Sequence, residues 1–431
     1  MDVILQRQQE EDLDDEAHLQ QLALLATLFL GIAENEQNKV RRRNPSRLYL
    51  RRHQLMPFPR LDSPWQRLWA AQDDRSFITT MGFDVRTFRY ILEGRNRFAE
   101  RWNNTPIPRN DVSSQAGPRI HARSLDAAGA LGLVLHYLSS SMLEITLQQV
   151  FALVPSVLTR YLDFAKQILL QTLRSMPEAQ IKLPRNLDEF QANSDLITAR
   201  HSQLEGGFGS IDGLSLPTEV SDDVEMENAT YNGWKSEHRI NNVFVFSPQG
   251  LIIDASLNAP GSWHDAHVSR RIFERLRTRV PEGYYLIADT AFPRGDDSIS
   301  GKIRAPVKAG ECIPANPTEQ EQFMAFNRQL LSFRQTAEWG MRALQGAFGR
   351  LRVPLPINDP RGRLLLLEII ARLFNVWTVC VGINQIRNVY EPIWHASEDE
   401  QLWNTLGDMV FGEIRKRDRV SRFHVVAVPD T

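Results

Sequence analysis

Apolar residues between positions 124 and 173 recur with the period of an α-helix. The pattern predicts a helix over residues 124–138, a turn at 139–141, and two further helices over 146–153 and 155–173. A short helix, a tight turn and a longer helix form the outline of a helix-turn-helix, whose later helix lies in a DNA major groove. Its polar candidates are Thr159, Arg160 and Lys166. Most of its other residues suit a core, so a purely structural packing of three helices is the alternative.

From residue 208 onward, the apolar pattern changes to that of short strands separated by turns and helices. The predicted elements are a strand at 208–213, two strands at 242–246 and 251–256 joined by a hairpin turn at 247–250, a helix at 265–277, a buried strand at 284–288, a long helix at 327–348, and an apolar helix at 364–383 that closes the core. This order predicts an α/β fold: a ribonuclease-H-like mixed sheet flanked by helices. An all-helical, helix-turn-helix-like region precedes it.

Composition places the chain among ordinary globular proteins. Hydrophobic residues make up 42% and charged residues 24% of the 431 positions, which excludes a collagen-like or wholly disordered chain. The longest apolar run, residues 22–33, is twelve residues long, short of the roughly 20 that a bilayer requires. Two cysteines, Cys312 and Cys380, fit a reducing compartment. We therefore expect a soluble protein that is not secreted and has no membrane span.

Charge is balanced overall but strongly patterned near the N-terminus. The net charge is -2, so any basic surface must be local. Acidic residues precede the apolar run, and residues 39–60 beyond it carry eight basic residues and no acid: Lys39, Arg41, Arg42, Arg43, Arg47, Arg51, Arg52 and Arg60. Such a block serves as a nuclear-import signal or a phosphate-binding arm, which predicts a nuclear protein; a solvated linker is the alternative. The basic residues between 415 and 422 fit a solvated end.

Three acids occupy related places in the predicted α/β fold. Asp212 and Asp289 end the first and fourth strands, and Glu338 lies on the long helix. These two strands lie side by side in a ribonuclease-H-like sheet, about 4.8 Å apart, so their acids would share one crevice that the glutamate completes. Clustered carboxylates raise one another's pKa values, and Mg²⁺ or Mn²⁺ relieves their repulsion. Two such ions would activate a water or a 3′-hydroxyl and stabilise the leaving oxygen of a phosphodiester.

Each acid also has a purely structural interpretation. Asp212 precedes a glycine and could start a turn. Asp289 could cap the segment that follows its strand. Glu338 has Arg334 and Arg342 four residues away on either side, as in an ion-pair ladder on a solvated helix face. The combination of all three in this order of strands and helix favours catalysis and metal binding.

Several short motifs surround these acids in a fixed order. They are Gly209-Ser-Ile-Asp-Gly213, Tyr231-Asn-Gly-Trp-Lys-Ser-Glu-His238, Gly261-Ser-Trp-His-Asp265, Tyr285-Leu-Ile-Ala-Asp-Thr-Ala-Phe-Pro293, Ala337-Glu-Trp-Gly340 and Phe348-Gly-Arg-Leu351. On these motifs the chain resembles the Harbinger-type DDE superfamily of transposases and transposase-derived nucleases, over about residues 125–383. The resemblance implies that Asp212, Asp289 and Glu338 form the catalytic triad. The 48 residues between the last two are typical of the family.

The pair His264-Asp265 is similar to the His-Asp pair of the same family. The resemblance implies an auxiliary metal ligand or a hydrogen bond beside the active site for Asp265. The alternative is helix capping, because Ser262-x-x-Asp265 fits a loose capping box and an acid suits the first turn of a helix. His264 and His267 do not predict zinc, since no further ligand stands at a suitable spacing.

Basic residues near the acids are candidate contacts to nucleic acid. Lys235 and His238 belong to the second motif and would touch a phosphate; pairing with the acids at 222–227 is the alternative. The other candidates are Arg294, Lys302, Arg304, Lys308 and Arg342. Phosphate contacts of this kind give affinity without reading sequence.

The predicted organisation has five parts. They are an acidic then basic arm at 1–60, a mixed helical region and linker at 61–118, a helical DNA-binding-like domain at 119–200, a DDE nuclease core at 201–390, and a basic tail at 391–431. We expect a DNA endonuclease or transposase that uses two Mg²⁺ (or Mn²⁺) ions. The resemblance implies a Myb-like DNA-binding partner, and a homo-oligomer stays open. The alternatives are a catalytically silent DNA-binding or scaffold protein and a metal-independent, carboxylate-pair hydrolase such as a glycosidase.

Overall fold

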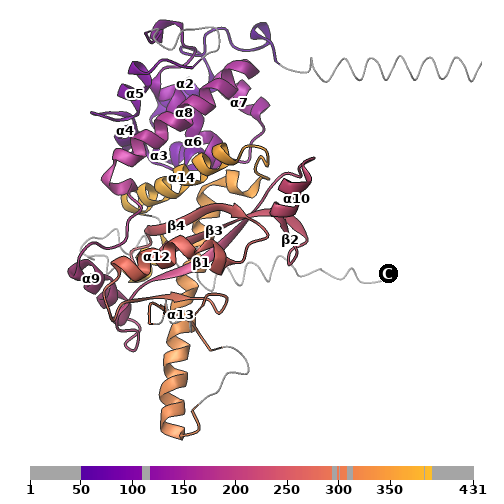
Figure 1. Cartoon of the computed structure of the whole chain (residues 1–431). Coiled ribbons are helices and arrows are strands. Elements are labelled where there is room, and N and C mark those ends of the chain that lie inside the picture. Colours follow the sequence, from indigo (N-terminus) through magenta and orange to yellow (C-terminus); the bar gives the residue numbers. More distant parts are fainter. Residues whose placement is uncertain are drawn as a thin grey trace, which may run out of the picture. The chain divides into compact units, whose positions relative to one another are not determined.

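A computed structural model describes residues 50–108, 117–293, 299, 301–307, 314–382 and 384–390. The chain divides into two compact units: Met1–Met176 with Phe348–Val353, and Pro177–Ala347 with Pro354–Thr431 (Figure 1). Several predictions fall outside the described residues: the basic block up to Arg47, the sites Arg294 and Lys308, Cys312, and the tail at 391–431.

The regular elements of unit 1 in its described part are helices, without a strand. Its α-helices are α2 (Pro64–Ala71), α3 (Asp74–Met81), α4 (Val85–Leu92), α5 (Phe98–Asn104), α6 (Ala127–Ser139), α7 (Glu144–Phe151) and α8 (Pro155–Ser175). The helices α2, α3, α4 and α6 begin where a side-chain oxygen accepts a hydrogen bond from a backbone N–H three residues on, at Ser63, Asp73, Asp84 and Asp126. The region predicted to be mixed, 61–118, is therefore built from capped short helices in its described part.

The helix α8 is the centre of unit 1. It packs against α5, α6 and α7, and ten of its 21 residues are buried. Of its polar candidates, Lys166 forms an ion pair with Asp163 of the same helix at 2.9 Å. The buried part of this helix fits the alternative of structural packing. The other eleven residues, Thr159 and Arg160 among them, are half-buried or exposed, so groove binding stays a prediction.

Unit 2 is built around a mixed β-sheet. Its elements are α9 (Leu187–Thr198), β1 (Gly207–Pro217), α10 (Val224–Thr230), β2 (Tyr231–Asn232), β3 (Glu237–Phe246), β4 (Ile252–Pro260), α11 (Asp265–Val268), α12 (Arg270–Arg279), β5 (Tyr285–Ala288), β6 (Ile303–Arg304), α13 (Pro317–Ala347), α14 (Pro360–Val376), the π-helical turn Trp377–Val381 and α15 (Gln385–Tyr390). The predicted boundary at residue 200 falls inside this unit, because α9 packs on β1.

The strand order is β2-β3-β1-β5-β6, and β4 also pairs with β3. The strand β1 is antiparallel to β3 and parallel to β5. The predicted first and fourth strands therefore do lie side by side. The sequence underestimated several lengths: β1 continues to Pro217, β3 begins at Glu237, and α13 begins at Pro317. The predicted helix at 265–277 is two helices that meet at Ser269.

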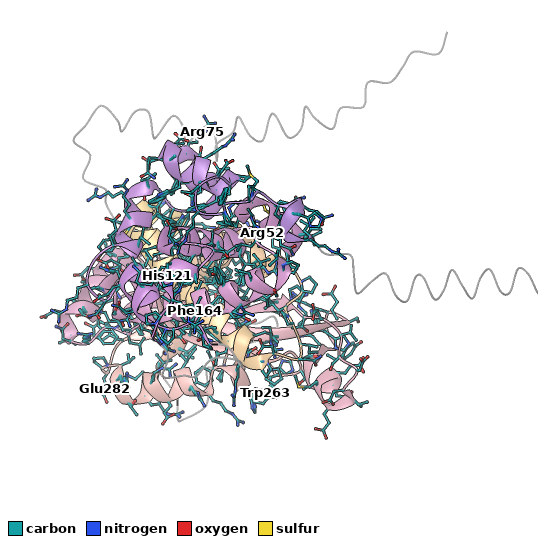
Figure 2. All side chains as sticks on the ribbon, turned by 90° about the horizontal axis from the view of Figure 1, so that it is seen from above. Arg52, Arg75, His121, Phe164, Trp263 and Glu282 are labelled. Carbon is teal, nitrogen blue, oxygen red and sulfur yellow. The ribbon has the colours of Figure 1, made fainter. Side chains whose placement is uncertain are left out.

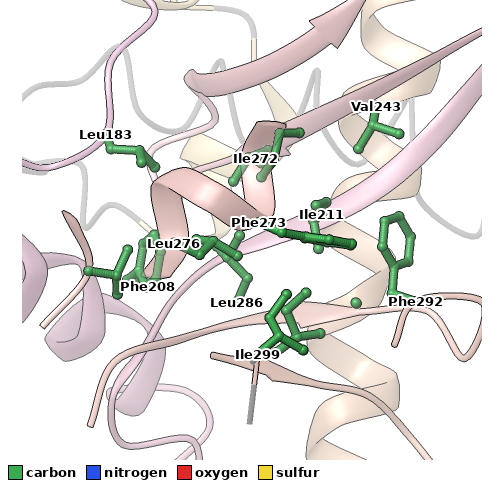
Figure 3. Packing of buried hydrophobic residues seen from close by; sticks show 14 of the residues in the cluster. Leu183, Phe208, Ile211, Val243, Ile272, Phe273, Leu276, Leu286, Phe292 and Ile299 are labelled. Carbon is green, nitrogen blue, oxygen red and sulfur yellow. The ribbon is translucent and has the colours of Figure 1, made fainter. Parts of the chain in front are cut away.

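Helices cover both faces of the sheet. On one face, α9, α11 and α12 enclose a cluster of buried residues that includes Phe208, Ile211 and Leu286 (Figure 3). On the other face, α13 and α14 pack against β1, β3 and β4. A Cβ atom on Gly340 of α13 would lie 2.7 Å from the ring of Phe246, so only glycine permits this close approach. The sheet is thus buried on both sides, as its apolar strands predict.

The most apolar helical segment of the described chain is Pro360–Val381, which includes α14. By length and composition alone it could cross a membrane, but 56% of its most apolar stretch is buried within the structure. Phe374 contacts Phe246 of β3 at a ring distance of 6.1 Å. The packing is that of a core helix, which is the role predicted for the apolar helix at 364–383.

Candidate active site

The two strand-end aspartates are neighbours on parallel strands. In the register of β1 and β5, Ile211 is opposite Ala288, and an aspartate follows each of them directly. Both of these apolar residues are buried in the cluster between the sheet and α12. Since successive residues of a strand point to opposite faces, Asp212 is directed to the α13 face. Asp212 does not start a turn, because β1 continues for five more residues.

Each of the two carboxylates is oriented by a backbone donor. The Oδ1 atom of Asp212 accepts a hydrogen bond from the N–H of Gly213 at 2.7 Å. The Oδ1 atom of Asp289 accepts one from the N–H of Thr290 at 2.6 Å. These local bonds leave the second oxygen of each carboxylate free for another partner.

Asp265 is a third acid of the same site. A Cβ atom placed on Gly213 would lie 2.5 to 2.6 Å from three atoms of the Asp265 carboxyl group. Only a residue without a side chain lets this carboxyl group lie against β1 at the position after Asp212, and burial, together with the charge of Asp265, raises the pKa of Asp212. Asp265 is the first residue of α11, and the preceding residue His264 is the N-cap without a side-chain cap. The predicted capping box with Ser262 is therefore absent, although the acid does occupy the first helical turn.

Two asparagines hold the turn that carries Asp265. The side-chain Nδ2 atoms of Asn232 and Asn241 both donate to the carbonyl of Gly261, at 2.9 and 3.2 Å. Asn241 also donates to the carbonyl of Trp263 at 2.7 Å. The sequence analysis missed these positioning residues. The available signal was an amide pair, Asn241-Asn242, inside an otherwise apolar strand.

Glu338 reaches the site through an arginine on its own helix. The Nη2 atom of Arg334 lies 3.1 Å from Oε1 of Glu338, and its Nη1 atom lies 3.6 Å from Oδ1 of Asp289. One guanidinium therefore joins the helix acid to the strand acid. The structural alternative for Glu338, an ion pair with an arginine four residues away, is present between Arg334 and Glu338. The same arginine also reaches Asp289, so the pair lies toward the other acids. The contact Thr336 Oγ1 to Ser210 Oγ, 2.8 Å, fixes α13 on β1 beside them.

The electrostatics confirm that the aspartates influence one another. Burial, reinforced by the charges of Asp289 and Asp265, raises the pKa of Asp212 to about 6, against the opposing effects of the Gly213 N–H and Arg334. Burial also raises the pKa of Asp265, with a further contribution from Asp289; His264 and Lys235 act in the opposite direction. The site therefore concentrates negative charge at a cost that a cation would relieve.

The chemistry of these side chains fits a hard divalent ion. All four acids offer carboxylate oxygens, which suit Mg²⁺ or Mn²⁺, and no cysteine takes part. Within the described residues, no three His, Cys, Asp or Glu side chains form a ready group that could hold a metal ion. Arg334 supplies the positive charge between two of the acids instead. Donor type and charge thus fit the ions, and Arg334 would have to move for both acids to bind one.

The predicted phosphate contacts have different surroundings. Lys235 is exposed in the turn between β2 and β3, and Arg342 is exposed on α13. The ring of His238 lies 3.2 Å from Thr230 Oγ1 and 3.7 Å from Glu227, so the alternative of pairing with the acids at 222–227 applies to it. The two remaining sites of known position are Lys302 and Arg304.

Both Lys302 and Arg304 are engaged in packing within unit 2. The Lys302 ammonium donates to the carbonyls of Val280 and Pro281 at 2.7 and 2.6 Å, which ties it to the end of α12. The Arg304 guanidinium lies 3.9 Å from the ring centre of Tyr285. Two carbonyls thus take two of the three donors of Lys302, while Arg304 is exposed as well as stacked.

A basic helix that the sequence analysis did not single out follows Asp265 closely. The helix α12 carries Arg270, Arg271, Arg275, Arg277 and Arg279 within ten residues. A groove of about 810 Å³ between β4, α12 and α14 is lined by three of these arginines together with Arg372. The signal was present as RRIFERLRTR, whose basic residues alternate with buried apolar ones.

Comparison with known proteins locates a family in this unit. Residues 211–384 match the family model described as DDE superfamily endonuclease. The matched range begins one residue before Asp212 and includes Asp265, Asp289 and Glu338. No curated protein matches the chain, and no solved structure matches it. Unit 2 thus contains a region similar to DDE superfamily endonucleases, which confirms the predicted likeness to DDE transposases and nucleases at this coarser level.

Proposed function

We propose that the protein is a metal-dependent DNA endonuclease of the DDE type, whose site could also join a freed 3′-hydroxyl to target DNA by strand transfer. One observation carries the proposal: within the matched region, Asp212 and Asp289 follow paired residues of adjacent parallel strands, and Arg334 joins Glu338 to Asp289. The Harbinger type is proposed from the motifs alone. The same resemblance and the basic block at 39–60 lead us to propose a nuclear location and a Myb-like partner.

In this proposal Asp212, Asp289 and Glu338 hold two Mg²⁺ or Mn²⁺ ions. When bound, such ions lower the pKa of a water or 3′-hydroxyl and stabilise the leaving oxygen of the phosphodiester. Asp212 must lose its proton first, and its pKa of about 6 means that it is ionised at neutral pH. Asp265 adds negative charge beside Gly213, where Asn232 and Asn241 fix its turn. Arg334, once displaced from Asp289, is placed to donate to a phosphate oxygen.

The DNA backbone would be held by exposed basic side chains of unit 2. Lys235 and Arg342 are exposed, and α12 adds arginines that line the groove beside β4. Contacts to phosphates release counterions and give salt-dependent affinity without reading bases. The proposal therefore predicts binding that weakens steeply as salt is raised.

Removal of divalent metal is the direct test of the proposed reaction. Full-length protein should nick supercoiled plasmid in Mg²⁺ or Mn²⁺, lose this activity in EDTA, and regain it with excess Mg²⁺. Gel electrophoresis of the plasmid forms measures the rate. Nicking that is equal in EDTA and Mg²⁺ would contradict the proposal and favour a metal-independent hydrolase.

A catalytically silent DNA-binding protein is the second candidate. It is favoured by the pairing of Arg334 with Asp289 and Glu338 and by the lack, among the described residues, of a ready metal-binding group. Salt-dependent DNA binding with no nicking in Mg²⁺, Mn²⁺ or Co²⁺ would support this candidate. The buried charge of Asp212 argues against it, because clustered acids are costly where no cation binds.

Gly213→Ala tests the role of Asp265 without touching any acid. The new Cβ would overlap the Asp265 carboxyl group, so the acid must move away from β1 at position 213. We expect nicking to fall about 10- to 100-fold, the range found for residues that support metal ligands, and to match the fall in Asp265→Asn. Gly233→Ala is the control, because a Cβ there meets nothing within 4 Å. Full activity in Gly213→Ala together with loss in Asp265→Asn would contradict this placement.

A further inference from the structure

The turn between β2 and β3 presents a tryptophan almost entirely to solvent. The side chain of Trp234 is 94% exposed, the highest value among the large hydrophobic residues described. Single exposed apolar residues are common, but a fully exposed tryptophan forgoes the burial of one of the largest apolar side chains. Packing within unit 2 therefore does not account for the exposed position of Trp234.

Strand pairing and hydrogen bonds fix the conformation of the turn that carries Trp234. Strands β2 and β3 pair Tyr231 with His238 and Asn232 with Glu237. The N–H of Lys235 donates to the side-chain Oδ1 of Asn232 at 3.1 Å and to its backbone carbonyl at 3.2 Å. These bonds close the four-residue tip on both sides of the tryptophan. The turn itself follows β2, which lies at one end of the sheet (Figure 1).

The same turn is connected to the acid site. Asn232 donates through Nδ2 to the carbonyl of Gly261, and the N–H of Ser262 donates to the carbonyl of Ala229 at 3.2 Å. These contacts join the hairpin to the segment that ends at Asp265. The charge of Lys235 acts on Asp265, so the tip lies within electrostatic reach of the site. Trp263, labelled in Figure 2, is 43% exposed on that segment, and its ring contacts that of His267 edge to face with 4.1 Å between the ring centres.

The charges near the tip favour an unpaired nucleic-acid strand over a paired duplex as the ligand. Helix α10 and the two residues before it carry four acids, at positions 222, 223, 225 and 227, and strand β3 adds Glu237. These acids repel a phosphate backbone. Lys235 at the tip attracts one phosphate. A paired duplex presents two backbones and keeps its bases stacked inside, so it offers the indole no flat face. A base that has left the stack offers its face and only one phosphate beside it.

We propose that Trp234 is a stacking platform for an unpaired nucleobase of the DNA held at the acid site. The inference rests on the proposed function, because it takes DNA as the substrate. Base stacking on an aromatic ring is tolerant of base identity, so this contact positions a strand and does not read its sequence. Trp234 is a positioning residue, since it meets a base and not the scissile phosphate.

Binding of matched DNA probes tests the platform in the full-length protein. The probes are a fluorescein-labelled fork with unpaired thymine arms and a fully paired duplex of equal length, measured by anisotropy in EDTA. Wild type should prefer the fork. Trp234→Ala should weaken fork binding about 5- to 150-fold and leave duplex binding unchanged, while Trp234→Phe should keep most of the preference. Leu187→Ala, which removes another exposed apolar side chain from α9, should behave as wild type.

A second probe reports on stacking itself. With 2-aminopurine in one unpaired arm, wild type and Trp234→Phe should quench its fluorescence, and Trp234→Ala should not. An equal fork preference and equal quenching in wild type and Trp234→Ala would overturn the inference and assign the tryptophan to a protein contact. Nicking by the same samples separates the two proposals. If the wild type nicks DNA but binds and quenches the fork no better than Trp234→Ala, only the platform is refuted. If the fork is bound and quenched through Trp234 but no sample nicks DNA, only the nuclease is refuted.

Discussion

Asp289→Asn is expected to lower magnesium-dependent nicking at least about 1000-fold, which corresponds to about 4 kcal/mol of activation free energy. Asparagine keeps the size of the side chain and its acceptor for the Thr290 N–H, but it removes the charge that a divalent ion requires. The helix partner Arg334 would then retain only Glu338. The loss should therefore appear in the rate with little change in folding.

Glu282→Gln is the matched control for this substitution. Glu282 precedes the strand β5, whereas Asp289 follows it, and the side chain of Glu282 is exposed. Its variant loses one negative charge from the same strand and should nick at the wild-type rate. Plasmid nicking in Mg²⁺ and circular dichroism of both variants provide the measurements. Equal nicking by Asp289→Asn and wild type would exclude Asp289 as a metal ligand.

Asp212→Asn is expected to stabilise the protein while it abolishes nicking. The pKa of Asp212 is about 6 in the folded protein against an ordinary value of 3.8, because the ionised carboxyl group is buried among other acids. A difference of about 2 units corresponds to about 3 kcal/mol of unfavourable free energy once the group is ionised. The neutral variant should therefore gain up to about 3 kcal/mol in the free energy of unfolding at pH 8, measured by urea titration in EDTA.

The pH dependence follows from the direction of this shift. Below pH 3.8 the carboxyl group is protonated in both the folded and the unfolded chain, so variant and wild type should be equally stable. As the pH rises through about 6, the wild type loses this contribution and the variant does not. Added Mg²⁺ should raise the stability of the wild type alone, because only its site binds the ion. A variant less stable than wild type at pH 8 would contradict the account.

Asp254→Asn is the matched control on β4, a strand of the same sheet that pairs with β3. Asp254 is also buried, and both its oxygens accept hydrogen bonds from Arg275, at 2.6 and 2.7 Å. Burial raises the pKa of Asp254 as well, but the hydrogen bonds and charge of Arg275 act against that shift. Removal of this carboxylate would leave a guanidinium donor without its acceptor. The free energy of unfolding should fall by about 1–3 kcal/mol, opposite in sign to Asp212→Asn. Opposite effects of Asp212→Asn and Asp254→Asn on stability would thus distinguish an aspartate with a functional role from one with a structural role.

Local sequence patterns were sufficient to predict the order of the elements and the proximity of Asp212 and Asp289. Short apolar runs separated by turns give strands, and the parallel pairing of β1 and β5 follows from their place in that order. Asp212 and Asp289 then come together because each follows a buried residue of an adjacent strand. Lengths were less accessible: β1 and β3 extend past the residues that the alternation marks, since pairing with a neighbour can continue a strand through polar positions.

The sequence by itself determined the types of acid, the strands that carry two of them and the helix that carries the third. The tertiary structure decided the rest, because these outcomes depend on contacts between distant residues. It brought Asp265 against Gly213, turned Arg334 toward Asp289, paired His238 with Glu227 and committed Lys302 to two carbonyls. It also buried α8 among three helices. The periodicity of the sequence shows which face of a helix or strand is apolar. The residues that this face contacts depend on tertiary packing.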